Sequence, residues 1–145
     1  PPPPLFFFQA EDGIRYFCLS RWLGDVYKRQ VEWRSNFVSK LQRAYPEIQV
    51  TTRDAQCVNN TISLLLPAIP AQIAVMSLDM DGFAISSGAA CSSGRVQESH
   101  VIKAMGFGVQ SSHVVRISFG WENTEDDISA LADAIIGLYK RFKEK

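Results

Sequence analysis

The sequence predicts an α+β fold, in which a small, mostly antiparallel sheet carries helices on one face. From residue 31 onward, stretches typical of helices and strands follow in the order helix, strand, strand, helix, strand, loop, helix, strand, helix. Residues 113–120 alternate as a half-buried strand does, whereas the C-terminal stretch carries an apolar stripe of helical period. With 145 residues, 46% of them hydrophobic, the chain can build one domain with a modest core.

The first helix is expected over residues 31–45. Apolar residues recur there at spacings of three and four, namely Phe37, Leu41 and Ala44 or Tyr45. A proline follows this run directly, and proline cannot continue a helix. We therefore expect the helix to end just before it.

Two strands and a second helix follow. Residues 48–52, IQVTT, predict a short strand, and residues 61–67, TISLLLP, predict a mostly buried one that a proline ends. Residues 71–82 predict a helix with Gly82 at its exit. Its apolar side is expected to be formed by Ile73, Met76 and Met80.

A third strand, residues 83–86, leads into a run of small residues. Ser99 then predicts the N-cap of a short helix that Gly106 closes. The alternation in residues 113–120 sends two sets of side chains to opposite faces of a strand, Val115, Ile117 and Phe119 on one and Val114, Arg116 and Ser118 on the other.

The last helix has the clearest start signal. Thr124 can cap it, and Asp127 stands three residues on, an aspartate variant of the capping box. One apolar stripe then runs along the helix, formed by Ile128, Leu131, Ala132, Ile135, Leu138, Tyr139 and Phe142. This stripe predicts that the helix packs on the sheet.

Charge and cysteine content exclude several classes of protein. Lys plus Arg equals Asp plus Glu at 15 each, so no surface for nucleic acid or an acidic membrane is predicted. No apolar run reaches the roughly 18 residues of a membrane span. The three cysteines, Cys18, Cys57 and Cys91, are odd in number and unevenly spaced, which predicts neither a disulfide framework nor a metal knuckle. A reducing, cytoplasmic setting is expected.

Residues 1–30 are expected to be a non-native or disordered leader, and residues 31–145 the domain. The leader starts with four prolines and shows no clean period of 2 or 3.6. Its segments FFFQAEDGIR and LGDVYKRQ resemble translated sequencing-adapter read-through. Such a segment would be left out of fold reasoning, and Cys18 with it.

Cys91 lies in the softest stretch of the chain, SSGAACSSG at residues 86–94. Small neighbours give a thiol access, and reactivity requires access and thiolate rather than packing. From the residues alone, Cys91 is either a reactive thiol or an idle loop thiol. Arg116 is likewise either a surface residue of the strand or a receptor for a carboxylate, which its planar fork fits.

The other candidate functional residues give weaker signals. Cys57 lies just before a predicted strand, and the sequence around it indicates no functional role. His100 and His113 have no neighbour at metal-ligand spacing, so no metal site is predicted. The GFG at residues 106–108 lacks the rest of a dinucleotide fingerprint.

Three segments together resemble the cysteine desulfurases, and in that family's order. They are residues 60–79, NTISLLLPAIPAQIAVMSLD, residues 82–106, GFAISSGAACSSGRVQESHVIKAMG, and residues 114–128, VVRISFGWENTEDDI. The cysteine segment is the specific one, and it resembles the group with a long active-site loop that serves iron–sulfur cluster assembly. The other two are common among related pyridoxal-phosphate enzymes of the class V aminotransferase family.

The resemblance implies the C-terminal small domain of a fold-type I pyridoxal-phosphate enzyme. It assigns Cys91 as the nucleophile and Arg116 as the residue that binds the carboxylate of the substrate, L-cysteine. Pyridoxal phosphate would act as the electron sink, leaving L-alanine and a persulfide on Cys91. A sulfur-acceptor or iron–sulfur scaffold protein would then take the sulfur, and a homodimer is expected for the full-length enzyme.

The resemblance also implies that the cofactor is bound mainly by an upstream domain. None of the six lysines stands in the Ser-x-His-Lys context of the family's cofactor lysine. The chain alone is therefore expected to be inactive. Two alternatives remain at this point: a related class V aminotransferase or lyase, and a non-catalytic α+β module that binds a partner.

Overall fold

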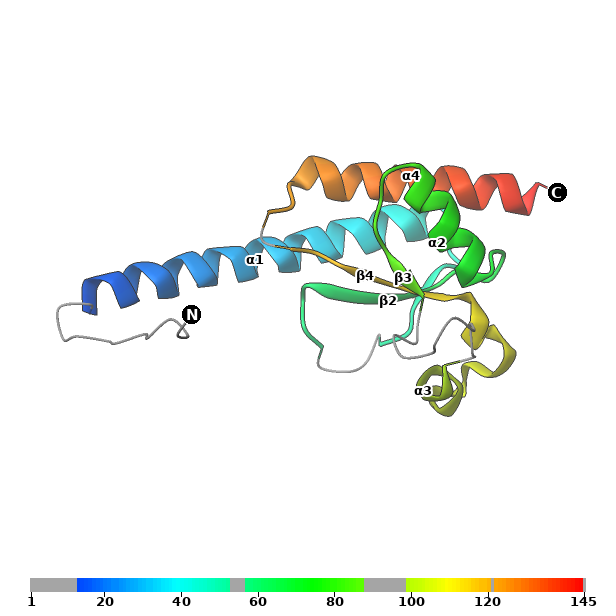
Figure 1. The fold of residues 1–145 in the computed structure, drawn as a ribbon, viewed down its shortest axis with the longest axis horizontal. Coiled ribbons are helices and arrows are strands. Elements are labelled where there is room, and N and C mark those ends of the chain that lie inside the picture. The colour runs from blue at the N-terminus through cyan, green and yellow to red at the C-terminus, as the bar shows by residue number, and fades with distance from the viewer. Residues whose placement is uncertain (1–12, 53–56, 88–98, 121, 145) are drawn as a thin grey trace, which may run out of the picture.

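The computed structural model describes residues 13–52, 57–87, 99–120 and 122–144, and Figure 1 shows their arrangement. The elements in chain order are α1 (Gly13–Ala44), β1 (Gln49–Val50), β2 (Thr61–Leu65), α2 (Ala71–Met80), β3 (Ser86–Ser87), α3 (His100–Ile102), η2 (Lys103–Phe107), η3 (Gly108–His113), β4 (Val114–Ser118) and α4 (Glu125–Lys143). The four strands form one sheet in the order β1-β2-β4-β3, and every neighbouring pair is antiparallel. The predicted α+β fold with a small antiparallel sheet is confirmed.

The three longer helices cover one face of the sheet. In Figure 1, α1 and α4 run side by side on the same side of the sheet as α2. The strand residues in the core they share are Ile62, Leu64, Val115 and Ile117. Since side chains alternate along a strand, Leu65 and Val114 point to the opposite face, where Ile102 of α3 packs on them. A small second cluster therefore lies beneath the sheet.

Helix α1 ends where the sequence predicts but begins much earlier. It runs from Gly13, whereas a start at residue 31 is expected from its pattern. The stretch from Gly24 to Arg29 is exposed apart from a half-buried Val26. In Figure 1, the N-terminal end of α1, drawn in blue, projects beyond the sheet. Extending a packed helix costs little once its first turns have formed, so residues without an apolar face can continue it.

Helix α2 packs through the side opposite to its larger apolar residues. Ile73, Met76 and Met80 do share a side, but they are exposed, Met80 to 87%. The buried residues are Ala71, Ala74 and Leu78. Small alanines let the helix lie close to its neighbours, and this contact outweighs the larger apolar area of the methionine side.

Helix α4 begins with the predicted capping box. The backbone N–H of Asp127 donates to Thr124 Oγ1 at 3.2 Å, and the N–H of Thr124 donates to Asp127 Oδ2 at 2.8 Å. The first turn carries three acidic residues and the last turn three basic ones, and both sets of charges stabilise the helix by interacting favourably with its dipole. The predicted stripe is buried from Ile128 to Tyr139, so both the helix and its predicted apolar side are confirmed.

Replacing Thr124 with alanine is expected to lower the free energy of unfolding by about 1 kcal/mol, since one N-terminal N–H loses its acceptor. Chemical denaturation of the chain measures this. Arg141→Ala, an exposed change at the far end of the same helix, is the control and should cost no more than about 0.5 kcal/mol. Equal stability of the two variants would contradict the capping role.

Asp127 adds a pH dependence to this cap. The pKa of its carboxyl is lowered from the ordinary value of 3.8, first because the carboxylate accepts the Thr124 N–H. A lowered pKa in the folded state gives stability above that ordinary value, and the stability is lost as the pH falls through the lowered pKa. Asp127→Asn is expected to flatten this part of an unfolding profile recorded between about pH 5 and pH 2.

Candidate functional site

Arg116 stands in the middle of the sheet, on strand β4. Its neighbours across the register are Ser63 on β2 and Ser86 on β3. Residues paired in this way point to the same face of a sheet, and here it is the face opposite the main core. All three side chains are half-buried. Three adjacent strands thus place Arg116 between two serines in one cross-strand row.

The polar side chains of this row have no recorded partner in the described part of the chain. No hydrogen bond or ion pair joins it to any other residue within the described ranges. The hydroxyls of Ser63 and Ser86 likewise have no hydrogen-bond partner in this part of the chain. A half-buried arginine without a carboxylate partner suits an anionic group, because its planar fork can donate two parallel hydrogen bonds.

Ser63, Arg116 and Ser86 form a row across the sheet, called here the Arg116 row, and its surroundings differ on its two sides. Towards one end of the strands, Thr61 and Ser118 form the next pair, with their hydroxyl oxygens 3.3 Å apart. Towards the other end, Leu65 and Val114 are buried beneath Ile102. The row around Arg116 therefore lies at the border between a polar sheet face and a small apolar cluster.

Cys91 lies outside the described residues, but both chain ends that flank its segment are described. On one side β3 ends at Ser87, which pairs with Val115 beside Arg116. On the other side Ser99 Oγ accepts the N–H of Ile102 at 3.4 Å, as its predicted capping role requires. Ile102 in turn packs on Leu65 and Val114, next to the Arg116 row. Both anchors of the Cys91 segment are therefore attached to the neighbourhood of Arg116.

The remaining candidates give no second site. Cys57 is a free, exposed thiol and does not belong to the core. His113 Nδ1 lies 3.0 Å from Ser112 Oγ, a local contact. Among the residues that the structure places, no cluster of three or more His, Cys, Asp or Glu could hold a metal ion. Nor is any helix of this part of the chain both long and apolar enough to cross a membrane.

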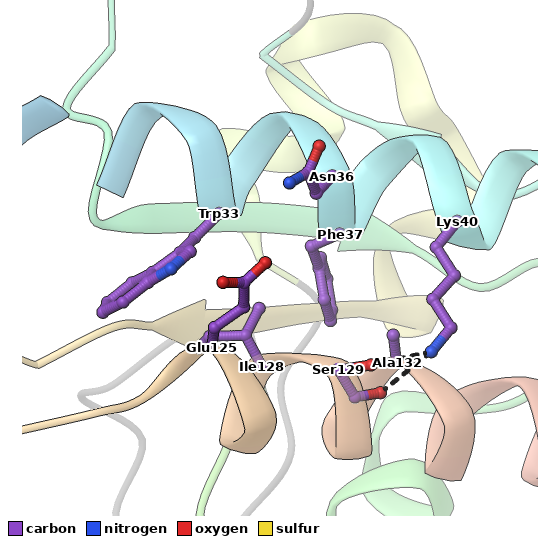
Figure 2. A pocket seen from close by; sticks show the side chains of 8 residues that line it. All are labelled: Trp33, Asn36, Phe37, Lys40, Glu125, Ile128, Ser129 and Ala132. Carbon is purple, nitrogen blue, oxygen red and sulfur yellow. Dashed lines mark hydrogen bonds between the residues drawn. The ribbon is translucent and has the colours of Figure 1, made fainter. Parts of the chain in front are cut away.

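A small pocket of about 90 Å³ lies between α1 and α4. Figure 2 shows its apolar floor and polar rim, formed by Trp33, Asn36, Phe37, Lys40, Glu125, Ile128, Ser129 and Ala132. Lys40 is engaged with Ser129 at 3.0 Å and with Asp133 at 2.7 Å. None of the described residues that line the pocket is a cysteine, and the pocket lies on the core side of the sheet, away from the Arg116 row.

The described lysines do not fit a site for pyridoxal phosphate. Lys40 and Lys140 pair with carboxylates on α4 and at its end, and Lys143 pairs with Glu47. Lys28 is exposed on the projecting part of α1, and Lys103 is exposed on η2. No strand beside Arg116 carries a lysine among the described residues.

Sequence reasoning alone identifies Arg116 but not its two serine neighbours. The period of two places Ser63 in an otherwise apolar strand, which marks it as a residue of the non-core face. Its pairing with Arg116 depends on the register between β2 and β4, which no local pattern reports. The pattern places Ser86 at the end of a strand over residues 83–86, whereas β3 is shorter and begins at Ser86.

Comparisons with known proteins show which proteins the chain resembles in sequence and fold. A cysteine desulfurase of Gluconacetobacter diazotrophicus is 33% identical over 86 residues, which are 59% of this chain and 22% of that protein. Cysteine desulfurase 2 of Trichormus variabilis is 30% identical over 122 residues, 83% of this chain and 30% of that one. The crystal structure of a NifS-like protein from Rickettsia africae superposes with a TM-score of 0.67 at 26% identity, over 79% of this chain and 29% of that one.

The chain thus spans between about a fifth and a third of the length of these relatives. The sequence model of the family Aminotransferase class-V matches residues 13–131, well over half of the chain. That match begins inside the segment that the sequence patterns set apart as a leader, at the residue where α1 begins. The chain belongs to the class V aminotransferase family.

Proposed function

We propose that this chain is the C-terminal part of a cysteine desulfurase, which takes sulfur from L-cysteine and leaves L-alanine and a persulfide on Cys91. The observation that carries the proposal is the open Arg116 between Ser63 and Ser86, with the Cys91 segment leaving from the same strand as Ser86. The cysteine desulfurases among the relatives support it.

Arg116 is proposed to bind the carboxylate of the substrate. The arginine is always charged and can hold both carboxylate oxygens in one plane, which fixes the orientation of the amino acid. The Cys91 segment begins just after Ser87, so covalent geometry keeps the Cα atoms of Ser87 and Cys91 within about 14 Å of each other. A nucleophile on that segment stays near an amino acid that Arg116 holds.

The proposed reaction balances without an external oxidant. The substrate carbon exchanges its bond to sulfur for a bond to hydrogen, and so gains the electron pair. The transferred sulfur exchanges its bond to carbon for a bond to the sulfur of Cys91. Thiolate is the nucleophilic form of the side chain, so the reaction requires Cys91 deprotonated and accessible.

The remaining parts of the proposal come from the family. Pyridoxal phosphate, which the family implies, is proposed to bind mainly to residues upstream of this domain. A sulfur-acceptor or iron–sulfur scaffold protein would receive the persulfide sulfur. We further propose a homodimer of the full-length protein and a cytoplasmic location, consistent with the free thiol of Cys57.

Residues 31–145 are proposed to be the domain and residues 1–30 a leader, of which Arg29 and Gln30 contact the domain. Deletion of residues 1–28 is expected to change the free energy of unfolding by less than about 0.5 kcal/mol. It retains Arg29, which lies 5.9 Å from the Trp33 ring, and the buried Gln30. Differential scanning calorimetry and denaturation measure the effect.

A deletion that extends through Trp33 is the matched control. Trp33 is only 8% exposed, so its loss should cost about 3–5 kcal/mol. If the shorter deletion costs as much as the longer one, the leader belongs to the core and the proposed boundary is wrong.

The function is tested in the full-length enzyme through Arg116. Arg116→Lys keeps the charge but loses the two-pronged geometry, so the KM for L-cysteine should rise about tenfold or more with the protein still folded. Lys140→Arg, an exposed change on α4, should leave the KM unchanged. An unchanged KM in Arg116→Lys would remove the arginine from the substrate site.

The isolated chain supplies a second test. It is expected to form no absorbance band of lysine-bound pyridoxal phosphate and to release no sulfide from L-cysteine. Sulfide release that a lysine substitution within residues 31–145 abolishes would show that the domain holds the cofactor itself.

A further inference from the structure

Ser63 and Ser86 form, with Arg116, the one cross-strand row of the described sheet in which a charged side chain lies between two hydroxyls. The three side chains come from three adjacent strands and are all half-buried. Neither serine hydroxyl nor the guanidinium has a partner among the described residues. By contrast, the next pair along, Thr61 and Ser118, lies with its hydroxyl oxygens within hydrogen-bond distance.

We propose that Ser63 and Ser86 act as substrate-positioning residues, which donate hydroxyl hydrogen bonds to the carboxylate that Arg116 holds. This inference rests on the proposed function, because it takes Arg116 as the carboxylate receptor. The three strands then form one carboxylate cradle, with a single positive charge at its centre and a neutral donor on each side.

The hydrogen-bond capacity of a carboxylate favours this arrangement. Its two oxygens offer about four acceptor sites, of which a two-pronged arginine uses two. The other two are left for neutral donors or water. A guanidinium accepts no hydrogen bond, so free hydroxyls beside it can direct their protons to the ligand.

The spacing of the sheet also fits. Neighbouring strands lie about 4.8 Å apart, so the two serine Cα atoms stand about 10 Å apart with Arg116 between them. The Arg116 side chain rises between them, and a hydroxyl that turns toward its guanidinium can give a carboxylate held there a hydrogen bond of about 2.7 Å.

The cradle is tested with propionate as the probe and the 145-residue chain as the protein. Backbone amide signals of the three residues and the Nε–H signal of Arg116 are followed by NMR during titration. We expect saturable shifts with propionate and none with propionamide, which has the same size but no charge. Arg116→Gln should abolish the response.

Ser63→Ala and Ser86→Ala are each expected to raise the dissociation constant for propionate about tenfold, the effect of one hydrogen bond to a charged group. Ser118→Ala is the matched control, since Ser118 lies on the strand of Arg116 and on the same face, one row away. It should bind propionate as the unmodified chain does. Amide spectra with unchanged dispersion show that each variant is folded.

The outcomes separate the two proposals. If both serine variants bind propionate normally while Arg116→Gln does not, the serine role is wrong and the arginine receptor stands. If Ser118→Ala weakens binding equally, the effect is not specific to the row and the cradle is likewise rejected. A chain whose signals do not respond to propionate, or respond equally to propionamide, overturns both.

Discussion

Replacing Phe37 with alanine is expected to lower the free energy of unfolding by about 3–5 kcal/mol, a large share of the roughly 5–15 kcal/mol typical of a domain. Phe37 is 2% exposed at the centre of the main core, and its ring meets that of Phe119 edge-on at 5.8 Å. The void left by the ring would join the small pocket of Figure 2, which Phe37 already lines. The surrounding helices cannot close a space of that size.

Met80→Ala provides the matched control for this prediction. It also removes a large apolar side chain, but one that is 87% exposed at the end of α2, so it should cost less than about 0.5 kcal/mol. Denaturation curves of both variants measure the difference. A costly Met80→Ala with a mild Phe37→Ala would mean that the core lies on the methionine side of α2.

The two sides of α2 show what a local pattern reports. The spacing of Ile73, Met76 and Met80 identifies a side of α2 on which the larger apolar residues lie, and the structure confirms that side. Which side meets the core is decided by the other elements, and here Ala74 and Leu78 allow the closer approach. A pattern that contains two possible sides cannot choose between them without the neighbours.

The confirmed predictions for β4 and α4 rest on local signals that allow only one interpretation. In β4 the alternation of Val115 and Ile117 with Arg116 leaves one apolar face, and that face is the buried one. In α4 the capping box fixes the start, because its two hydrogen bonds are made within four residues. The sequence patterns do not predict the start of α1, because no clean period is recognised in residues 1–30.

The same distinction between local patterns and contacts distant in the sequence applies to the candidate site. Arg116 could be singled out from its strand and from the resemblance to the desulfurases. Ser63 and Ser86 could not, because their place beside it follows from the pairing of strands far apart in the chain. The position of Cys91 in the sequence is known, but its place in the fold lies outside the described residues.

In the full-length enzyme, Cys91→Ser is expected to abolish persulfide formation and sulfur transfer. A hydroxyl is close to a thiol in size, but it is far less nucleophilic near neutral pH. The residues around Cys91 are serines, glycines and alanines, so no large side chain next to it in the sequence depends on the thiol for packing. Stability should therefore change by less than about 0.5 kcal/mol, and the cofactor spectrum should stay as in the unmodified enzyme.

Cys57→Ser is the control for this prediction. Cys57 is also a free thiol and is exposed just before β2, so its replacement removes one thiol from the same domain without touching the proposed nucleophile. Mass spectrometry after incubation with L-cysteine should find the added sulfur on Cys91 in this variant and in the unmodified enzyme. No added sulfur should be found in Cys91→Ser.

Two results would contradict the assignment. Sulfur transfer that survives Cys91→Ser and fails in Cys57→Ser would move the nucleophile to the other thiol. A Cys91→Ser enzyme that loses several kcal/mol of stability would give the thiol a structural role, because replacing a thiol that packs against nothing costs no more than about 0.5 kcal/mol. With the Arg116 cradle intact, loss of transfer at unchanged stability leaves sulfur chemistry as the role of Cys91.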